Sequence, residues 1–369
     1  MKRTHLFTHL LGFRPPLDFS QHRSHAKIAL TIPIDECSKA IAQRRRFAMF
    51  ILRKYFSCCC PCKTIFAPTV ITQPGCYVVM KDISLTTGPI ITIKAHNVTL
   101  DLAGHTLTLP LAHDANEVIR IESGFTNIYV KNGSIIGGSV GIKTTSIGSN
   151  SSNKIRISIK NITVENFAYK GITIGPIDQF YLIDSRIISD MNSGVGIGTN
   201  VGRCTGMILR NTFRCADSFV FEATNMDGAL IKGNQIFAES DGFGISVIGN
   251  ANIIEGNGIS KVHGYPISVD GNNNSIINNT VGNSFVNGIR IQKDNNLISG
   301  NVVGHTTSGV SIEGLNNLIE GNILGPNNEY GIDFISGSNN VYRNNMLRGN
   351  VSGPVHNATG NTDAGGNIV

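Results

Sequence analysis

The sequence lacks tryptophan, has few charged residues and contains no apolar run long enough to cross a membrane. Charged residues make up 15% of the 369 residues and aromatic residues 7%. The absence of tryptophan weakens the case for a flat sugar-stacking platform. The stretch RRRFAMFILRKYF has an apolar core of about six residues, far below the ~20 that a bilayer-spanning helix needs. The chain is therefore not predicted to be an integral membrane protein.

Cysteine is present, but it follows no recognisable pattern. The 8 cysteines are Cys37, Cys58, Cys59, Cys60 and Cys62 near the N-terminus, and Cys76, Cys204 and Cys215 in the remainder. This spacing is not that of a disulfide framework. The run CCCPC lacks the second ligand pair of a structural zinc site. We expect Cys204 and Cys215 to be separate buried residues, with a mutual disulfide as the alternative, and we predict neither a metal nor a cofactor.

The net charge of +6 is distributed unevenly. Residues 1–63 carry 12 Lys and Arg against 3 acidic residues, which leaves 19 basic and 22 acidic residues for the rest of the chain. The main part of the chain is thus mildly acidic, which does not favour binding to a phosphate backbone. Nucleic acid is therefore not an expected partner.

A repeat runs through the main part of the chain. A small or turn residue is followed by two apolar residues with one position between them, as in GITI, GISV and GIRI. The repeats begin at Gly171, Gly194, Ser218, Gly244, Pro266, Gly288, Gly309 and Gly331, at spacings of 23, 24, 26, 22, 22, 21 and 22. Alternation over so few residues, bounded by Gly, Asn and Ser, predicts short half-buried strands.

A second marker keeps the same period. Apolar strands close on Asn257, Asn279, Asn301, Asn322 and Asn345, at spacings of 22, 22, 21 and 23. Asparagine tolerates left-handed turns, and its amide can bond to the equivalent amide of the next repeat. We therefore predict that this column is a structural asparagine ladder, in preference to a catalytic row.

A period of about 22 residues is too short for a βαβ unit, which needs ~30. It does accommodate two or three strands and their corners. The sequence therefore predicts an all-β fold, a right-handed parallel β-helix solenoid of about ten coils over residues 68–345. We expect a basic tail over residues 1–67, either helical around 34–56 or disordered, and a β-helix over 68–369 with a C-terminal cap from about residue 346.

The segment TQPGCYVVMKDISLTTGPIITIKAHNVTLDLAGHTL, from Thr72 to Leu107, resembles the opening coil of bacterial β-helix proteins of the pectate-lyase-like superfamily, including the group related to the NosD copper-site maturation protein. The repeats extend the resemblance over residues 68–369. It implies the fold, an extracellular or cell-envelope location in many members, and frequent interaction with carbohydrate. It does not imply one activity, because the superfamily hosts lyases, hydrolases, epimerases and adhesins.

Candidate site residues lie on the outward face of the GIxI strands. One outward column is expected to contain Thr173, Gly196, Val220, Ser246, Ser268, Arg290, Ser311 and Asp333. A second, two residues further along each strand, is expected to contain Gly175, Gly198, Glu222, Ile248, Asp270, Gln292, Glu313 and Ile335. Charges gather in the C-terminal half of this face.

Four of these residues are candidates for catalysis: Asp270, Arg290, Glu313 and Asp333. Asp270 and Glu313 should lie two coils apart, about 10 Å, close to the span between acid and base in inverting glycoside cleavage. Arg290 could pair with a uronate carboxylate. The alternative is an exposed ion-pair ladder of little energetic value. The candidates for contacting a saccharide are His263, Tyr265, Gln292, Lys293 and Tyr330.

Most catalytic signatures of β-helix enzymes are missing. NTD occurs only at Asn361, and neither DD nor GHG occurs, which argues against a polygalacturonase. Arg290 stands among the acidic residues where a pectate-lyase calcium site would need carboxylates alone. The calcium-binding repeat GGxGxD and a Thr-x-Thr array are absent as well.

We predict a saccharide-facing β-helix that binds or processes an extended polysaccharide; the alternative is a non-catalytic surface or adhesin-like solenoid. An enzyme of this kind would be a polysaccharide lyase, an epimerase or a glycoside hydrolase. The start MKRTHLFTHLLGFRPP is not a clean signal peptide, so location rests on the resemblance. The basic, cysteine-containing tail suggests peripheral membrane contact, and the protein is expected to be a monomer.

Overall fold

The computed structural model describes residues 61–111, 116–145, 155–175, 177–189, 195–199 (backbone only), 204–215, 221–238 and 242–369. The predicted helix around residues 34–56 and the predicted basic tail up to residue 60 lie outside this part of the chain, whereas Lys63–Ile65, at the end of that predicted tail, form a strand of the solenoid. The described residues contain strands and turns but no helix. This part of the chain therefore includes no helix that could cross a bilayer.

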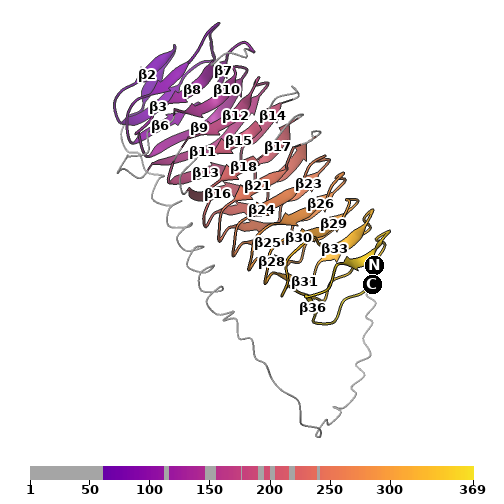
Figure 1. Cartoon of the computed structure of the whole chain (residues 1–369). Helices are drawn as coiled ribbons and strands as arrows, with labels where there is room; N and C mark the ends of the chain where they lie inside the picture. Colours follow the sequence, from indigo (N-terminus) through magenta and orange to yellow (C-terminus); the bar gives the residue numbers. More distant parts are fainter. Residues whose placement is uncertain are drawn as a thin grey trace, which may run out of the picture. The chain divides into compact units, whose positions relative to one another are not determined.

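The described chain is a parallel β-solenoid of about 11 turns, which confirms the predicted architecture. One side, here called face 1, is a sheet of 13 strands in which each strand pairs with its copy in the next coil. Its strands are β2 (Thr69–Ile71), β5 (Ile91–Ile93), β8 (Glu117–Ile121), β10 (Val140–Thr144), β12 (Lys170–Ile174), β15 (Val195–Thr199), β18 (Phe221–Thr224), β21 (Ile245–Ile248), β24 (Ile267–Asp270), β27 (Ile289–Ile291), β30 (Val310–Ile312), β33 (Tyr330–Phe334) and β35 (Gly353–His356). Figure 1 shows these strands stacked from the indigo to the yellow end of the chain.

The remaining 23 strands form one sheet that consists of two ladders. The first, face 2, contains β1 (Lys63–Ile65), β3 (Gly75–Val79), β6 (Val98–Asp101), β9 (Ile128–Ile136), β11 (Arg156–Glu165), β13 (Gln179–Ile183), β16 (Thr205–Leu209), β19 (Leu230–Lys232), β22 (Ile253–Glu255), β25 (Ser275–Ile277), β28 (Leu297–Ser299), β31 (Leu318–Glu320), β34 (Val341–Arg343) and β36 (Thr362–Asp363). The second, face 3, contains β4 (Ile83–Ser84), β7 (Thr106–Thr108), β14 (Arg186–Ser189), β17 (Thr212–Cys215), β20 (Gln235–Ala238), β23 (Gly258–Ser260), β26 (Thr280–Gly282), β29 (Val302–Gly304) and β32 (Ile323–Leu324). Strands β9 and β11 are long enough to belong to both ladders.

The core is a continuous column of apolar side chains inside the coils. On face 1 the inward residues Ile142, Ile172 and Ile245 have no exposed surface. Each fully buried side chain of this kind contributes roughly 1.5–3 kcal/mol relative to an exposed one. The alternation of apolar residues within each short strand thus indicates which side chains point into the column.

The predicted outward column of face 1 is wrong in two coils. Thr173 pairs with Gly198, Gly198 with Glu222, and Glu222 with Ser246, so Gly198 and Glu222 take the places expected for Gly196 and Val220. A slip of two residues preserves which side chains point inward, because side chains alternate with a period of two. The motif was assigned to GVGI at Gly194, whereas the pairing of Ile172 with Ile197 places the repeat two residues later in this coil.

The predicted asparagine ladder is confirmed. From Asn257 to Asn345, each side-chain Nδ2 donates to the Oδ1 of the next asparagine at 2.9–3.0 Å. A second buried ladder, which the sequence analysis missed, consists of Asn252, Asn274, Asn296, Asn317 and Asn340, with corresponding distances of 3.0–3.1 Å. Four of its members follow another asparagine whose φ is 55–59°, so each Asn-Asn pair combines a left-handed corner with a ladder amide.

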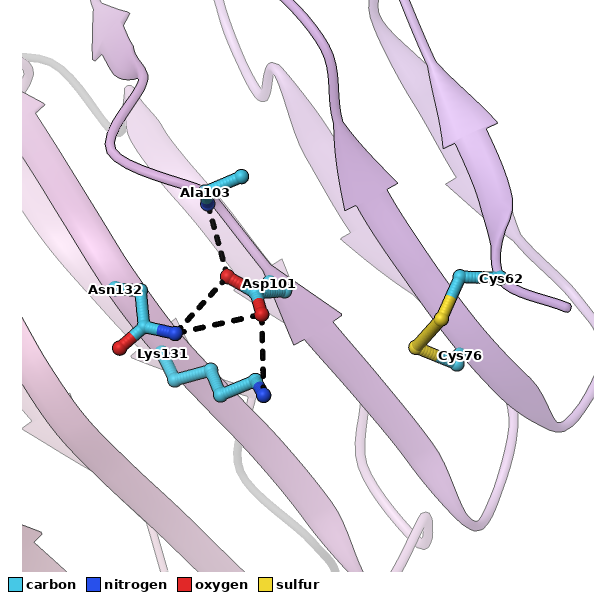
Figure 2. The surroundings of a disulfide bond; sticks show 6 residues. All are labelled: Cys62, Cys76, Asp101, Ala103, Lys131 and Asn132. Atoms are coloured by element: carbon cyan, nitrogen blue, oxygen red, sulfur yellow. Dashed lines mark hydrogen bonds and ion pairs between the residues drawn. A yellow bond between two sulfur atoms is a disulfide. The ribbon is translucent and has the colours of Figure 1, made fainter. Parts of the chain in front are cut away.

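A disulfide joins Cys62 to Cys76 at the N-terminal end of the solenoid (Figure 2). The sequence analysis did not predict it. Lys63 pairs with Tyr77 in the parallel strands β1 and β3, so the residues before them are neighbours, with 4.6 Å between their Cα atoms. As expected, Cys204 and Cys215 are buried and unbonded. Burial raises the pKa of both thiols to about 12, which makes them poor nucleophiles.

Candidate functional site

The candidate residues lie on the C-terminal half of face 1. In successive coils Ser268 pairs with Arg290, Arg290 with Ser311, Ser311 with Asp333, and Asp333 with His356. These five residues therefore form one column on strands β24, β27, β30, β33 and β35. Ser268, Ser311 and Asp333 are buried, so the exposed surface of the column is formed mainly by Arg290 and His356.

Arg290 is held between a carboxylate and an aromatic ring. Its Nε donates to Glu313 Oε1 at 2.7 Å, and this hydrogen bond raises the pKa of the guanidinium. Its Cζ lies 5.0 Å from the centre of the Tyr265 ring, which in turn stacks on Phe243 at 5.6 Å. The side chains of Arg290 and Glu313 are 27% and 26% exposed, so the guanidinium is oriented but still accessible to a ligand.

Asp270 is also paired, although with a different cation. Lys293 Nζ lies 3.5 Å from Asp270 Oδ1, and the two side chains are 55% and 34% exposed. Gln292 is half-buried next to Lys293, and its backbone N–H donates to the Val269 carbonyl at 3.0 Å. Asp270 and Glu313 are thus each matched by a cation, an arrangement better suited to holding charge than to delivering a proton to a leaving group.

Asp333 contacts a histidine that the sequence analysis missed. His356 Nδ1 lies 2.9 Å from Asp333 Oδ1, and the His356 ring stacks on Tyr330 at 4.5 Å with 7° between the ring planes. The Asp333 side chain is 10% exposed and His356 is 42% exposed. His356 was assigned to a C-terminal cap, whereas β35 adds another strand to face 1. In the sequence, the sign that His356 belongs to this column is its distance of 23 residues from Asp333, which is close to the length of one coil.

His263 belongs to the edge of the same region. It meets Phe285 edge-on at 4.8 Å, and Phe285 is 73% exposed. Together with Tyr265 and Tyr330 it supplies rings beside the charged column. Among the described residues, no group of three or more His, Cys, Asp or Glu could hold a metal ion.

Comparison with known proteins supports the fold. A family model described as a right-handed β-helix region matches residues 234–369. A search of the curated proteins finds no match.

Among solved structures, the A-module of the mannuronan C-5 epimerase AlgE4 of Azotobacter vinelandii has a TM-score of 0.58 at 14% identity, covering 79% of this chain and 91% of that one. The periplasmic alginate epimerase AlgG has a TM-score of 0.53 at 14% identity, covering 66% of each chain. The Dettilon tailspike protein has a TM-score of 0.53 at 15% identity, covering 77% of this chain and 63% of that one. The chain is thus a right-handed parallel β-helix protein that shares its fold with pectate-lyase-like epimerases and a tailspike.

Proposed function

We propose that face 1 binds an extended acidic polysaccharide, with Arg290 as the residue that receives a carboxylate of the polymer. The observation that carries this proposal is the setting of Arg290, which is oriented by Glu313 and lies over Tyr265 while about a quarter of its side chain stays exposed. A guanidinium presents several donors in a planar fork, which suits recognition of a carboxylate.

A stack of parallel strands suits a linear polymer. Successive coils place side chains about 4.8 Å apart along one straight face, so a chain that lies across the coils can repeat the same contact. The rings of Tyr265 and Tyr330 flank the charged column, where they support the Arg290 guanidinium and the His356 ring. Two proteins with the same fold are epimerases of alginate and of mannuronan, which adds support for a saccharide ligand.

If the protein catalyses a reaction of the polymer, the described residues include a candidate proton acceptor, His356. Asp333 contacts His356 Nδ1 at 2.9 Å, which leaves Nε2 as the ring nitrogen available for proton transfer. A histidine oriented in this way and lying three coils from Arg290 on the same face would suit a lyase or an epimerase, both of which remove a proton next to a carboxylate. The proposed binding depends on the geometry around Arg290 and does not require proton transfer by His356.

An envelope or extracellular location fits this ligand. The Cys62–Cys76 disulfide supports it, because such bonds persist mainly in oxidising compartments.

The proposal is tested by screening the purified protein against polygalacturonate, alginate and neutral dextran, following both binding and the formation of unsaturated product or reducing ends. Arg290→Ala should weaken binding of the uronate polymers about tenfold. Arg343→Ala is the matched control, because Arg343 pairs with Glu320 at 2.7 Å on face 2. A wild-type protein that binds no polysaccharide, or an Arg290 variant that behaves like the control, would refute the proposal.

One observation favours the alternative, a non-catalytic surface or adhesin-like solenoid that binds protein. Val302, Ile323, Met346 and Ile368 follow one another in register on face 3 and its continuation, each 39–45% exposed. An aligned apolar row of this kind is a feature of interaction surfaces. Two results together would support this alternative: the wild type binds no polysaccharide, and Ile323→Lys weakens the attachment of this protein to its protein partner.

A further inference from the structure

A second charged cluster lies on face 1, near its N-terminal end, and it is built around a buried carboxylate. Arg120 Nη2 donates to Glu117 Oε2 at 2.6 Å, and Lys143 Nζ donates to Glu117 Oε1 at 2.7 Å. The Glu117 side chain is 3% exposed, whereas Arg120 and Lys143 are 31% and 32% exposed. Both oxygens of Glu117 are therefore occupied, and each cation keeps an accessible side.

The cluster holds more positive than negative charge. Burial by itself would raise the pKa of Glu117, but the hydrogen bonds from Lys143 and Arg120 outweigh it and the pKa is lowered. The carboxylate is thus ionised at neutral pH, and two cations share one anion. A single cation would neutralise Glu117, so the second is in excess.

The immediate neighbours in the column add donors and no acid. Arg120 pairs with Thr92 in one direction and Lys143 with Thr173 in the other. Within the described chain, Arg120 Nε and Thr173 Oγ1 are buried and have no hydrogen-bond partner. The next charges along the strands are Lys94 and Glu122, which lie 3.8 Å apart and balance each other. The cluster therefore carries an excess cation, and the parts of it that a ligand can reach are the exposed parts of the Arg120 and Lys143 side chains.

We propose that Arg120 and Lys143 form a second anion-binding site that receives a carboxylate of the polymer, with Glu117 as the residue that positions both cations. This inference rests on the proposed function, because it assigns the same acidic polymer to face 1. Glu117 fixes side chains that would otherwise lose conformational entropy on binding, which is the advantage of a preorganised site.

The two sites lie far apart on the same face. The register leads from Lys143 through Thr173, Gly198, Glu222, Ser246 and Ser268 to Arg290. These six coil steps correspond to about 29 Å at ~4.8 Å per coil. A polymer that spans this distance contacts both sites, and its second contact forms at a high effective concentration. A trisaccharide is too short to do so, so the proposed acidic polymer must be a long chain to occupy both sites.

The test compares Lys143→Gln and Arg120→Gln with the wild type, using long polygalacturonate, trigalacturonate and dextran sulfate as probes. Glutamine removes the charge but keeps a donor for Glu117, so the fold should survive in at least one of the two variants. Lys232→Gln is the matched control, because Lys232 pairs with Glu255 at 2.7 Å on face 2. We expect each variant on face 1 to lose about tenfold in affinity for long polygalacturonate and to lose the preference of the wild type for the long over the short probe.

The outcomes separate this inference from the proposed function. If Arg290→Ala weakens polygalacturonate binding while Lys143→Gln and Arg120→Gln match Lys232→Gln, the second site is refuted and the proposed function stands. If only the Arg120 and Lys143 variants weaken binding, the second site stands and the role of Arg290 falls. A loss confined to dextran sulfate would overturn the assignment of a carboxylate ligand.

Discussion

Glu117 and Glu313, two of the glutamates of face 1, illustrate how burial changes the role of an ion pair. Glu313 and its partner Arg290 are about a quarter exposed, and such pairs contribute only ~0–1 kcal/mol to folding. Glu117 is almost completely buried, so losing its partners would leave an uncompensated charge. Substitutions at Arg290 should therefore report on ligands, whereas substitutions at Glu117 should also report on stability.

The lowered pKa of Glu117 predicts how its contribution to stability changes with pH. Its ordinary value is 4.5 and the folded value lies below this, so the contribution is complete above pH 4.5 and is lost as the pH falls through the folded pKa. Melting temperatures of the wild type and Glu117→Gln should differ clearly at about pH 7, and the difference should shrink as the pH falls below 4.5.

Glu255→Gln serves as the comparison for this measurement. Glu255 also pairs with a lysine, but its side chain is 23% exposed, so its substitution should change the melting temperature less at neutral pH. A difference between wild type and Glu117→Gln that stays constant across the pH range would contradict the assignment of an ionised, doubly paired Glu117.

At the scale of the element, the coils are joined by asparagine ladders as well as by strand pairing. In the first ladder the backbone N–H of each asparagine also donates to the next side chain, as from Asn301 to Asn322 Oδ1 at 2.9 Å. Asn301 further donates from Nδ2 to the Ile276 carbonyl at 2.8 Å, one coil back. Each ladder residue therefore links three consecutive coils.

Replacing one ladder residue should destabilise the solenoid strongly. Asn301→Ala leaves buried donors and acceptors of the neighbouring coils without partners, and each such group costs roughly 1–3 kcal/mol. We expect a loss of about 3 kcal/mol in the free energy of unfolding, measured by urea denaturation. Asn328→Ala is the control, because Asn328 is exposed. Equal effects of the two substitutions would show that the ladder contributes little.

At the scale of the whole molecule, a solenoid is stabilised by contacts between neighbouring coils, so its ends matter more than its length. The N-terminal coil begins with β1, which pairs with β3, and the Cys62–Cys76 disulfide closes a separation of 14 residues there. A loop of this length contributes about 3 kcal/mol in the chain-entropy description. The disulfide thus acts as a clamp on the first coil.

This clamp predicts where the chain can be shortened. A protein that begins at residue 61 retains Cys62 and β1, and it should be soluble and melt within a few degrees of the full chain. A protein that begins at residue 66 loses both, and its melting temperature should fall markedly. Thermal melts with and without reductant check this, because reduction should affect only the longer of the two. A soluble full chain with an insoluble residue-61 version would instead make the preceding residues a required cap.

The sequence alone determined the architecture, because a parallel solenoid repeats the same local pattern in every coil. The apolar alternation and the recurring asparagines need only neighbouring residues to be read, and they predicted the strands, the period and the first ladder. The same alternation named Asp270, Arg290, Glu313 and Asp333 as candidates on the outward face, and their functional role stays a prediction.

Only the tertiary structure decided which side chains meet between coils. Coil length varies, so that Lys143 pairs with a residue 30 positions later while Ser268 pairs with one 22 positions later. Where the coils are irregular, the period no longer gives the register, and the Glu117 cluster and the Cys62–Cys76 bond were missed for that reason. Partner choice also depends on side-chain reach, which is why Asp270 pairs with Lys293 while Arg290 pairs with Glu313. The local period can be read from the sequence, because it depends on neighbouring residues. Contacts between coils depend on how many residues each coil has in its corners, which the period does not give.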